Sequence, residues 1–119
     1  PGKHPRVAWL TFQHRRPPAR TVRRWWQRWP GANVGAVTGE ISGIAVLDVD
    51  PRNGGVASLE ALERAWGVLG PVVESLTGGG GRHLYFAHPG RPLSTGPLAP
   101  GLDLKGVRLG AGWPCFPPA

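Results

Sequence analysis

The 119-residue chain contains 19 Gly and 14 Pro, so more than a quarter of its residues weaken helices and sheet interiors. Ten aromatic residues and 40% hydrophobic residues overall nevertheless exceed what a disordered segment carries. We therefore expect one globular domain over residues 1–119, cut at both ends from a longer protein. The single cysteine, Cys115, excludes an internal disulfide and is typical of a reducing cytosol. No apolar run reaches the roughly 20 residues of a membrane span, so we expect a cytoplasmic domain with no membrane partner.

The charge of the chain is concentrated at one end. The formal net charge is +7, and residues 1–30 contain eight basic residues and no acidic one, whereas residues 31–119 contain six basic and all seven acidic residues. Such a basic segment attracts polyphosphates independently of base sequence, which makes nucleic acid a natural partner. A solvated arginine-rich surface that serves solubility is the alternative.

The N-terminal residues predict a short strand and then a helix. Residues 7–12 are apolar and predict a strand, which Pro17-Pro18 ends. Thr21 is a candidate N-cap for a helix that runs to Trp29. Apolar residues recur there at helical spacing, and they are Val22, Trp25, Trp26 and Trp29. This face predicts packing into a core, with base stacking as the alternative, while the arginines of the helix meet solvent or phosphate.

The rest of the chain predicts strands around a second helix. Residues 33–38 and 44–48 predict two adjacent strands joined by a hairpin loop, the second of them central in a sheet and covered on both faces. Residues 59, 62, 65 and 66 predict the apolar face of a helix. Further strands are predicted at residues 72–77, 83–86 and 102–104, with a glycine loop at 78–81. The pattern beyond residue 105 is irregular.

Two acidic residues, Asp48 and Asp50, lie two positions apart at the end of the predicted central strand. In extended geometry both side chains project to one side, where their carboxylates repel each other unless they are protonated or bridged by a cation. Such an oxygen-rich pair suits Mg²⁺ or Mn²⁺. The alternative is structural, with Asp50 opening a turn before Pro51. An EF-hand is excluded because its obligatory glycine position would be Asn53.

A glycine loop delivers Arg82 and His83 to the start of a strand. Glycine lets backbone N–H groups approach an anion closely, and both side chains can donate hydrogen bonds to phosphate. The alternative is a flexible hairpin loop with a surface histidine. No Gly-Lys-Ser/Thr follows, which excludes a P-loop. Asp103, followed by Lys105, adds a third candidate metal ligand from a separate segment.

Three segments occur in a specific order, Leu-Asp-Val-Asp-Pro, Gly-Gly-x-His-Leu-Tyr-Phe and Gly-Leu-Asp-Leu-Lys-Gly. Together they resemble the bifunctional DNA primase/polymerase N-terminal (prim-pol) domain of the archaeo-eukaryotic primase superfamily. Gly2-Lys3-His4-Pro5 and Asn33-Val34-Gly35 also resemble that family, and the similarity runs through most of residues 2–106. The resemblance implies an α/β (α+β) fold with an RRM-like catalytic core, in which helices flank a central mixed or antiparallel sheet.

The resemblance also implies nucleotidyl transfer on a single-stranded DNA template, in which a 3′-hydroxyl attacks the α-phosphate of an NTP or dNTP and pyrophosphate leaves. The implied catalytic residues are Asp48, Asp50, His83 and Asp103, and the three aspartates would hold two Mg²⁺ or Mn²⁺ ions. The expected nucleotide-binding residues are Gly80, Gly81, Arg82, His83 and Lys105. The expected DNA-binding residues are Arg15, Arg16, Arg20, Arg23, Arg24 and Arg28.

The sequence departs from the family pattern at two places. Gly81 stands where the family usually has a small hydroxyl residue, and Pro114 falls in an expected strand and would remove a ladder donor. A catalytically inactive nucleic-acid-binding fragment of a replication protein is therefore the alternative function, and a Gly/Pro-rich structural module is a third. The resemblance suggests a mobile element, phage or plasmid, and it leaves open whether a helicase domain of the parent protein is a partner.

Overall fold

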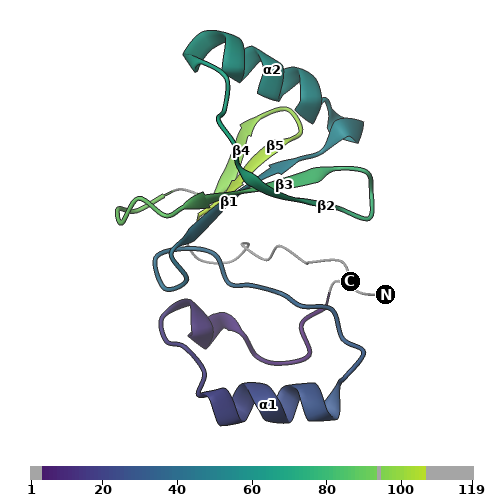
Figure 1. Cartoon of the computed structure of the whole chain (residues 1–119), viewed down its shortest axis with the longest axis vertical. Coiled ribbons are helices and arrows are strands. Elements are labelled where there is room, and N and C mark those ends of the chain that lie inside the picture. Colours follow the sequence, from purple (N-terminus) through teal and green to yellow (C-terminus); the bar gives the residue numbers. More distant parts are fainter. Residues whose placement is uncertain (1–3, 94, 107–119) are drawn as a thin grey trace.

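The computed structural model describes residues 4–93 and 95–106, which form one sheet with helices on either side (Figure 1). Its elements are η1 (Leu10–Gln13), α1 (Ala19–Arg28), β1 (Ile44–Val49), η2 (Pro51–Asn53), α2 (Gly55–Trp66), β2 (Val73–Leu76), β3 (Arg82–Ala87), β4 (Gly96–Ala99) and β5 (Leu102–Lys105). The strand order is β2-β3-β1-β5-β4, and each neighbouring pair is antiparallel. The expected α+β class is confirmed, with the antiparallel form of the sheet.

Strand β1 is the centre of the sheet because both of its hydrogen-bonding edges are occupied. β3 pairs along one edge and β5 along the other. Ala45, Val46, Leu47 and Val49 of β1 are buried, so residues from both faces of this strand are shielded from water. The apolar run without alternation therefore predicted a central strand correctly.

The hydrophobic core lies between the sheet and α2. Leu47, Val49, Leu84 and Leu102 point from three neighbouring strands toward Leu59 of α2. Full burial of a side chain of this size contributes about 1.5–3 kcal/mol. The predicted apolar face of this helix is only partly used, because Leu62 packs at the margin of the core and Trp66, the last residue of α2, is 86% exposed.

The opposite face of the sheet carries the alternate residues of the same strands, and we call it the site face. It is defined by Val46, Asp48, His83 and Asp103, which the strand register places on the side away from the core residues. Helix α1 and η1 lie on this side of the sheet, and α2 lies on the other (Figure 1). The site face is therefore turned toward a different part of the chain from the one that builds the core.

The N-terminal predictions were only partly correct. Residues 7–12 form no strand; η1 occupies their end, and Phe12 packs edge-on against Trp25 with ring centroids 5.3 Å apart. Helix α1 begins at Ala19 rather than after Thr21, and its N-cap is Pro18, which has an extended backbone and no side-chain cap hydrogen bond. None of its residues is buried, so the predicted tryptophan face does not enter a core.

The predicted hairpin at residues 33–48 was wrong. Residues 33–38 form no strand; Gly35 and Gly39 each take part only in an isolated bridge, and the bridge of Gly39 is with Ile44. The cause is competition for hydrogen bonds. β3 occupies one edge of β1 along its whole length and β5 occupies the other from Val46 to Val49, so a local partner can pair only with the first residues of the strand. His88 continues the β3 pairing by donating its N–H to the Gly43 carbonyl at 2.8 Å.

The sequence did not predict strand β4, because this strand begins with Gly96 and Pro97, two residue types that usually interrupt a strand. An edge strand tolerates proline, and the register shifts between Pro97 and Ala99. The predictions for Cys115 and for Pro114 lie outside the described residues, as do those for Gly2 and Lys3. Among the described residues, none of the helices has the length and apolar character needed to cross a membrane.

Candidate active site

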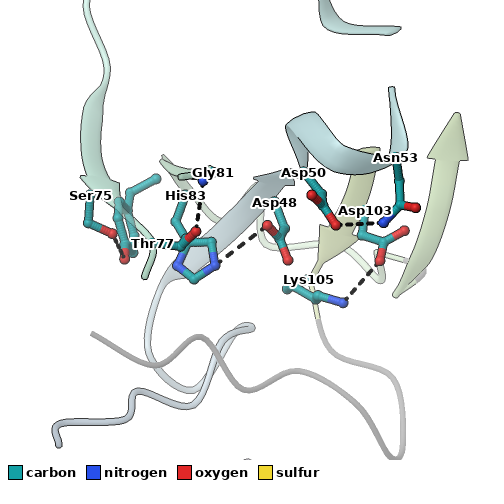
Figure 2. Close-up of polar contacts among 10 residues, drawn as sticks. Asp48, Asp50, Asn53, Ser75, Thr77, Gly81, His83, Asp103 and Lys105 are labelled. Carbon is teal, nitrogen blue, oxygen red and sulfur yellow. Dashed lines mark hydrogen bonds and ion pairs between the residues drawn. The ribbon is translucent and has the colours of Figure 1, made fainter. Parts of the chain in front are cut away.

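Three side chains expected to act together form one row across the middle of the site face. In the strand register, Asp48 on β1 lies directly opposite His83 on β3 and, on its other side, directly opposite Asp103 on β5. Directly opposed residues on antiparallel strands have Cβ atoms about 4.5–5.5 Å apart. Segments separated by 35 and 55 positions in the sequence thus meet at Asp48 (Figure 2).

Both carboxylates of the row have a basic side chain as a neighbour. His83 Nε2 lies 3.6 Å from Asp48 Oδ1, and Lys105 Nζ lies 3.5 Å from Asp103 Oδ2. The His83 side chain is only 10% exposed, whereas the side chains of Asp48 and Asp103 are 32% and 43% exposed. A ligand approaching from solvent therefore meets the two carboxylates first, and His83 borders them from a fixed position in the sheet.

Asp50 does not join this row. It follows β1 and caps η2, where its Oδ1 accepts the N–H of Arg52 at 2.9 Å and its Oδ2 accepts the amide of Asn53 at 2.7 Å. The structural alternative for Asp50, that it opens a turn, thus describes its contacts. Because each oxygen of a carboxylate has two lone pairs, these bonds leave acceptor capacity on both.

Two glycines fix the position of Asp50 relative to the strand that carries Asp103. The Asp50 N–H donates to the Gly101 carbonyl at 2.8 Å, and the Asp50 carbonyl accepts the Gly55 N–H at 2.8 Å. A Cβ on Gly55 would lie 2.4 Å from the Gly101 carbonyl oxygen, and a Cβ on Gly101 would lie 2.5 Å from the Gly55 nitrogen. The two acidic segments can approach this closely only with glycine at both positions.

Gly81 makes a similar close approach. A Cβ at this position would lie 2.6 Å from the Val49 carbonyl oxygen and 3.0 Å from Thr77 Oγ1. The departure from the family pattern at residue 81 therefore has a steric cause in this chain, because the backbone of the glycine loop contacts the end of β1. Arg52 adds a second link, since its guanidinium donates to the Gly79 carbonyl at 3.2 Å.

Of the two cations expected to bind nucleotide, only Lys105 lies on the site face. Arg82 alternates with His83 along β3, so it projects to the α2 side of the sheet. There its Nη1 lies 3.2 Å from Glu74 Oε2, and both side chains are partly exposed. The structure thus brings His83 and Lys105 beside the acidic row and does not bring Arg82 there.

The donor set fits a hard divalent cation that takes part of its ligands from substrate. In the described ranges, no group of three or more His, Cys, Asp or Glu side chains is close enough together to hold a metal ion. Asp48 and Asp103, however, face each other across β1 and β5, and one or two carboxylates plus substrate phosphates are what Mg²⁺ commonly uses. The two-ion arrangement with Asp50 remains a prediction.

The arginine-rich segment forms a separate surface. Along α1 the arginines recur at 20, 23, 24 and 28, which is the spacing of one helix face, and all four are exposed. Arg15 is also exposed, whereas Arg16 donates two hydrogen bonds to the Ile41 carbonyl, at 3.0 and 3.2 Å. Arg16 thus joins this segment to the loop before β1. Arg28 also lies over the Trp29 ring, 5.2 Å from its centroid, and the exposed guanidinium groups of the segment face solvent.

Fold and site together define a class: an α+β domain in which a row of acidic residues and a histidine crosses an antiparallel sheet on the face opposite its core helix. Comparison with known protein families identifies the family within this class. The chain belongs to the family of bifunctional DNA primase/polymerase N-terminal domains, whose sequence model matches residues 1–118. A search of curated proteins found no match to the chain. Family membership makes primase/polymerase chemistry the activity to which the site has to be compared.

Sequence reasoning missed three polar residues that contact the site segments. Asn53 and Arg52 hold Asp50 and the glycine loop, and Thr77 bonds to Gly81. No periodicity or motif distinguishes these residues. Their position was the one signal, because Arg52 and Asn53 lie two and three residues after Asp50 and Thr77 precedes the four glycines.

Proposed function

We propose that the chain is the catalytic domain of a metal-dependent DNA primase/polymerase, which makes or extends primers on single-stranded DNA from nucleoside triphosphates. The observation that carries this proposal is the register of His83, Asp48 and Asp103 on three adjacent strands. Family membership supports the reaction class. Reactions of this type depend on positioning and on charge neutralisation rather than on a covalent intermediate with the protein.

The residues of the row would divide the work by charge. Asp48 and Asp103 would hold Mg²⁺ or Mn²⁺, with Asp50 as the third carboxylate of a two-ion set. Cations bound there would lower the pKa of the attacking 3′-hydroxyl and neutralise the leaving pyrophosphate. His83 and Lys105 each lie within 4 Å of a carboxylate of the row. A triphosphate bound to cations at these carboxylates would therefore lie close to both side chains, which would donate hydrogen bonds to it.

The exposed arginines of α1 would hold the template by its phosphates. Contacts of this kind are independent of base sequence, which suits an enzyme that copies any template. Because α1 and the acidic row lie on the same side of the sheet, a strand bound to the helix would pass on the site side of the domain (Figure 1).

The direct test is incorporation of a labelled nucleotide on single-stranded DNA, with Mg²⁺ or Mn²⁺, in the full chain and in Asp48→Asn. We expect incorporation by the unaltered chain and a loss on the order of 10³-fold in the variant, since the substitution removes one ligand charge. Glu60→Gln, an exposed neutralisation on α2, is the matched control and should retain activity. Equal activity of Asp48→Asn and the control would refute the assignment of the site.

A catalytically inactive nucleic-acid-binding fragment is the second candidate. It is favoured by the contacts of Asp50, whose two oxygens both accept protein hydrogen bonds, and by the lack of a three-ligand cluster among the described side chains. This candidate predicts salt-dependent binding of single-stranded DNA without incorporation under either metal. A single-turnover incorporation assay separates the two functions.

A further inference from the structure

The amides of the glycine loop are used inside the loop itself. The Gly80 N–H donates to the Thr77 carbonyl at 3.0 Å, and the Gly81 N–H donates to Thr77 Oγ1, also at 3.0 Å. The Thr77 N–H in turn donates to the Gly81 carbonyl at 2.8 Å. A phosphate that accepted from Gly80 or Gly81 would have to break these bonds. The donor that the loop offers to an anion is therefore not either of the two amides expected from the sequence.

The Thr77 hydroxyl is a donor at the base of the loop that these bonds leave available. A hydroxyl has one hydrogen and two acceptor lone pairs, and here a lone pair faces the Gly81 N–H, so the hydrogen points elsewhere. Thr77 is two positions beyond Ser75, which lies opposite His83 in the strand register. Thr77 follows the last residue of β2, but its N–H donates to the Gly81 carbonyl and so continues the pairing with the residues before β3. Residues two positions apart in an extended strand share a face, so Thr77 belongs to the His83 side of the sheet, and Figure 2 draws both residues with the bond from Gly81 to Thr77.

The neighbouring positions cannot supply an equivalent donor. A side chain at residue 81 is excluded by the Val49 carbonyl 2.6 Å from its Cβ position, and Arg82 is turned to the other face, where it pairs with Glu74. The Ser75 hydroxyl lies 2.9 Å from the Tyr85 hydroxyl and is engaged with it. Thr77 thus combines an oriented hydroxyl, a backbone held by two hydrogen bonds to Gly81 and Gly80, and a place on the His83 side of the sheet.

We propose that Thr77 binds the phosphate chain of the incoming nucleotide, donating its hydroxyl hydrogen to a phosphate oxygen while its oxygen accepts the Gly81 N–H. This inference rests on the proposed function and adds a residue to its triphosphate contacts. The bond to Gly81 polarises the hydroxyl toward donation, because hydrogen bonds in a chain strengthen one another. The row of phosphate donors on the site face then runs from Thr77 through His83.

The experiment measures equilibrium binding of a nucleoside triphosphate, the matching monophosphate and inorganic tripolyphosphate, each with Mg²⁺, to the full chain. The variants are Thr77→Val and Thr77→Ala, which lack the hydroxyl, and Thr77→Ser, which keeps it. Ser75→Ala is the matched control, since it removes a hydroxyl two positions earlier in the chain and on the same face of the sheet. Thermal unfolding of each variant reports whether removal of the acceptor for the Gly81 N–H changes the fold.

We expect Thr77→Val and Thr77→Ala to weaken triphosphate and tripolyphosphate binding about tenfold or more, as for a hydrogen bond to a charged group, and the monophosphate much less. Thr77→Ser and Ser75→Ala should bind within about threefold of the unaltered chain, because the hydroxyl at residue 77 is kept in both. Equal losses for all three ligands, or equal losses in Thr77→Ser and Thr77→Val, would show a purely structural role and overturn the inference.

Failure of the inference and failure of the proposed function give different results. If Thr77→Val binds triphosphate normally while Asp48→Asn abolishes incorporation, only the role of Thr77 is overturned. If the unaltered chain neither binds triphosphate nor incorporates nucleotide, both proposals are overturned.

Discussion

The N-terminal segment, residues 4–43, and the sheet segment, residues 44–106, differ in both charge and packing. The sheet segment holds the buried core and the acidic row, while α1 in the N-terminal segment buries none of its residues and exposes four arginines. We therefore expect stability and the proposed chemistry to depend on the sheet segment, and the proposed binding of nucleic acid to depend on the N-terminal segment. This division predicts that the three properties respond to substitutions in different places.

The largest expected effect is on catalysis, from Asp103→Asn. The substitution keeps the size of the side chain and removes one of the two facing carboxylates, so we expect incorporation to fall on the order of 10³-fold. Binding of single-stranded DNA should change less than about twofold, because Asp103 lies outside the arginine surface. Parallel loss of DNA binding and incorporation would contradict the proposed division between the segments.

The next effect is on stability, in a comparison of Leu84→Ala with Trp26→Ala. Leu84 is 2% exposed and belongs to the core, so its truncation should lower the free energy of unfolding by about 2–5 kcal/mol. Trp26 lies on a helix without buried residues, and its truncation should cost under about 1 kcal/mol despite the larger side chain. Urea unfolding followed by circular dichroism measures both. A larger loss for Trp26→Ala would mean that α1 is part of the cooperative core.

A third substitution, Gly81→Ala, should affect both stability and triphosphate binding by the sheet segment. In Gly81→Ala the new methyl group would meet the Val49 carbonyl at 2.6 Å, so β1 and the glycine loop must separate. We expect a loss of about 1–3 kcal/mol in stability, together with weaker triphosphate binding. Gly78→Ala is the control, because its Cβ position has no heavy atom within 4 Å. Similar stability of both variants would refute the close approach of the loop to β1.

The arginines of α1 should determine how strongly the binding of single-stranded DNA depends on salt concentration. Replacing Arg23 and Arg24 together by Gln should weaken binding of single-stranded DNA and reduce the slope of log affinity against log salt by roughly 1.4, because each phosphate that is no longer neutralised lowers the slope by about 0.7. Incorporation at saturating template should be retained. Arg64→Gln removes an exposed charge from α2 and is the matched control. An unchanged slope in the double variant would place the template elsewhere.

Short motifs in the sequence indicate the acidic residues and the histidine of the candidate site. The sequence did not predict that these residues lie next to one another on adjacent strands. Asp48, His83 and Asp103 become neighbours only through the pairing of β1 with β3 and β5, which are distant in the chain. The same long-range pairing explains why the local hairpin expected at residues 33–48 does not form. Local patterns predicted the two α-helices and four of the five strands of the described residues, together with two strands that do not form, at residues 7–12 and 33–38. The partners of β1, by contrast, depend on which strands bury the most apolar surface.

The failure of the tryptophan pattern has a different physical cause. Helical spacing of apolar residues in α1 states which residues share a face, and it does not state whether another element covers that face. Here Phe12 contacts Trp25, while Trp26 keeps 38% of its surface exposed. The fate of an apolar face depends on tertiary packing, so helix α2, with a similar pattern, buries Leu59 against the sheet.

The smallest effect distinguishes the two faces of the sheet, through Arg82→Gln and Lys105→Gln. Arg82 lies on the α2 side and forms a partly exposed pair with Glu74, a type of contact that contributes about 0–1 kcal/mol. Its neutralisation should change triphosphate affinity less than about twofold. Lys105 lies beside Asp103 on the site face, so Lys105→Gln should weaken triphosphate binding about tenfold, as expected when a charged donor to phosphate is lost. The two residues carry the same charge and lie on neighbours of β1, so only the face on which each lies distinguishes them. A larger loss in Arg82→Gln would therefore put the triphosphate on the α2 side, against the alternation of β3.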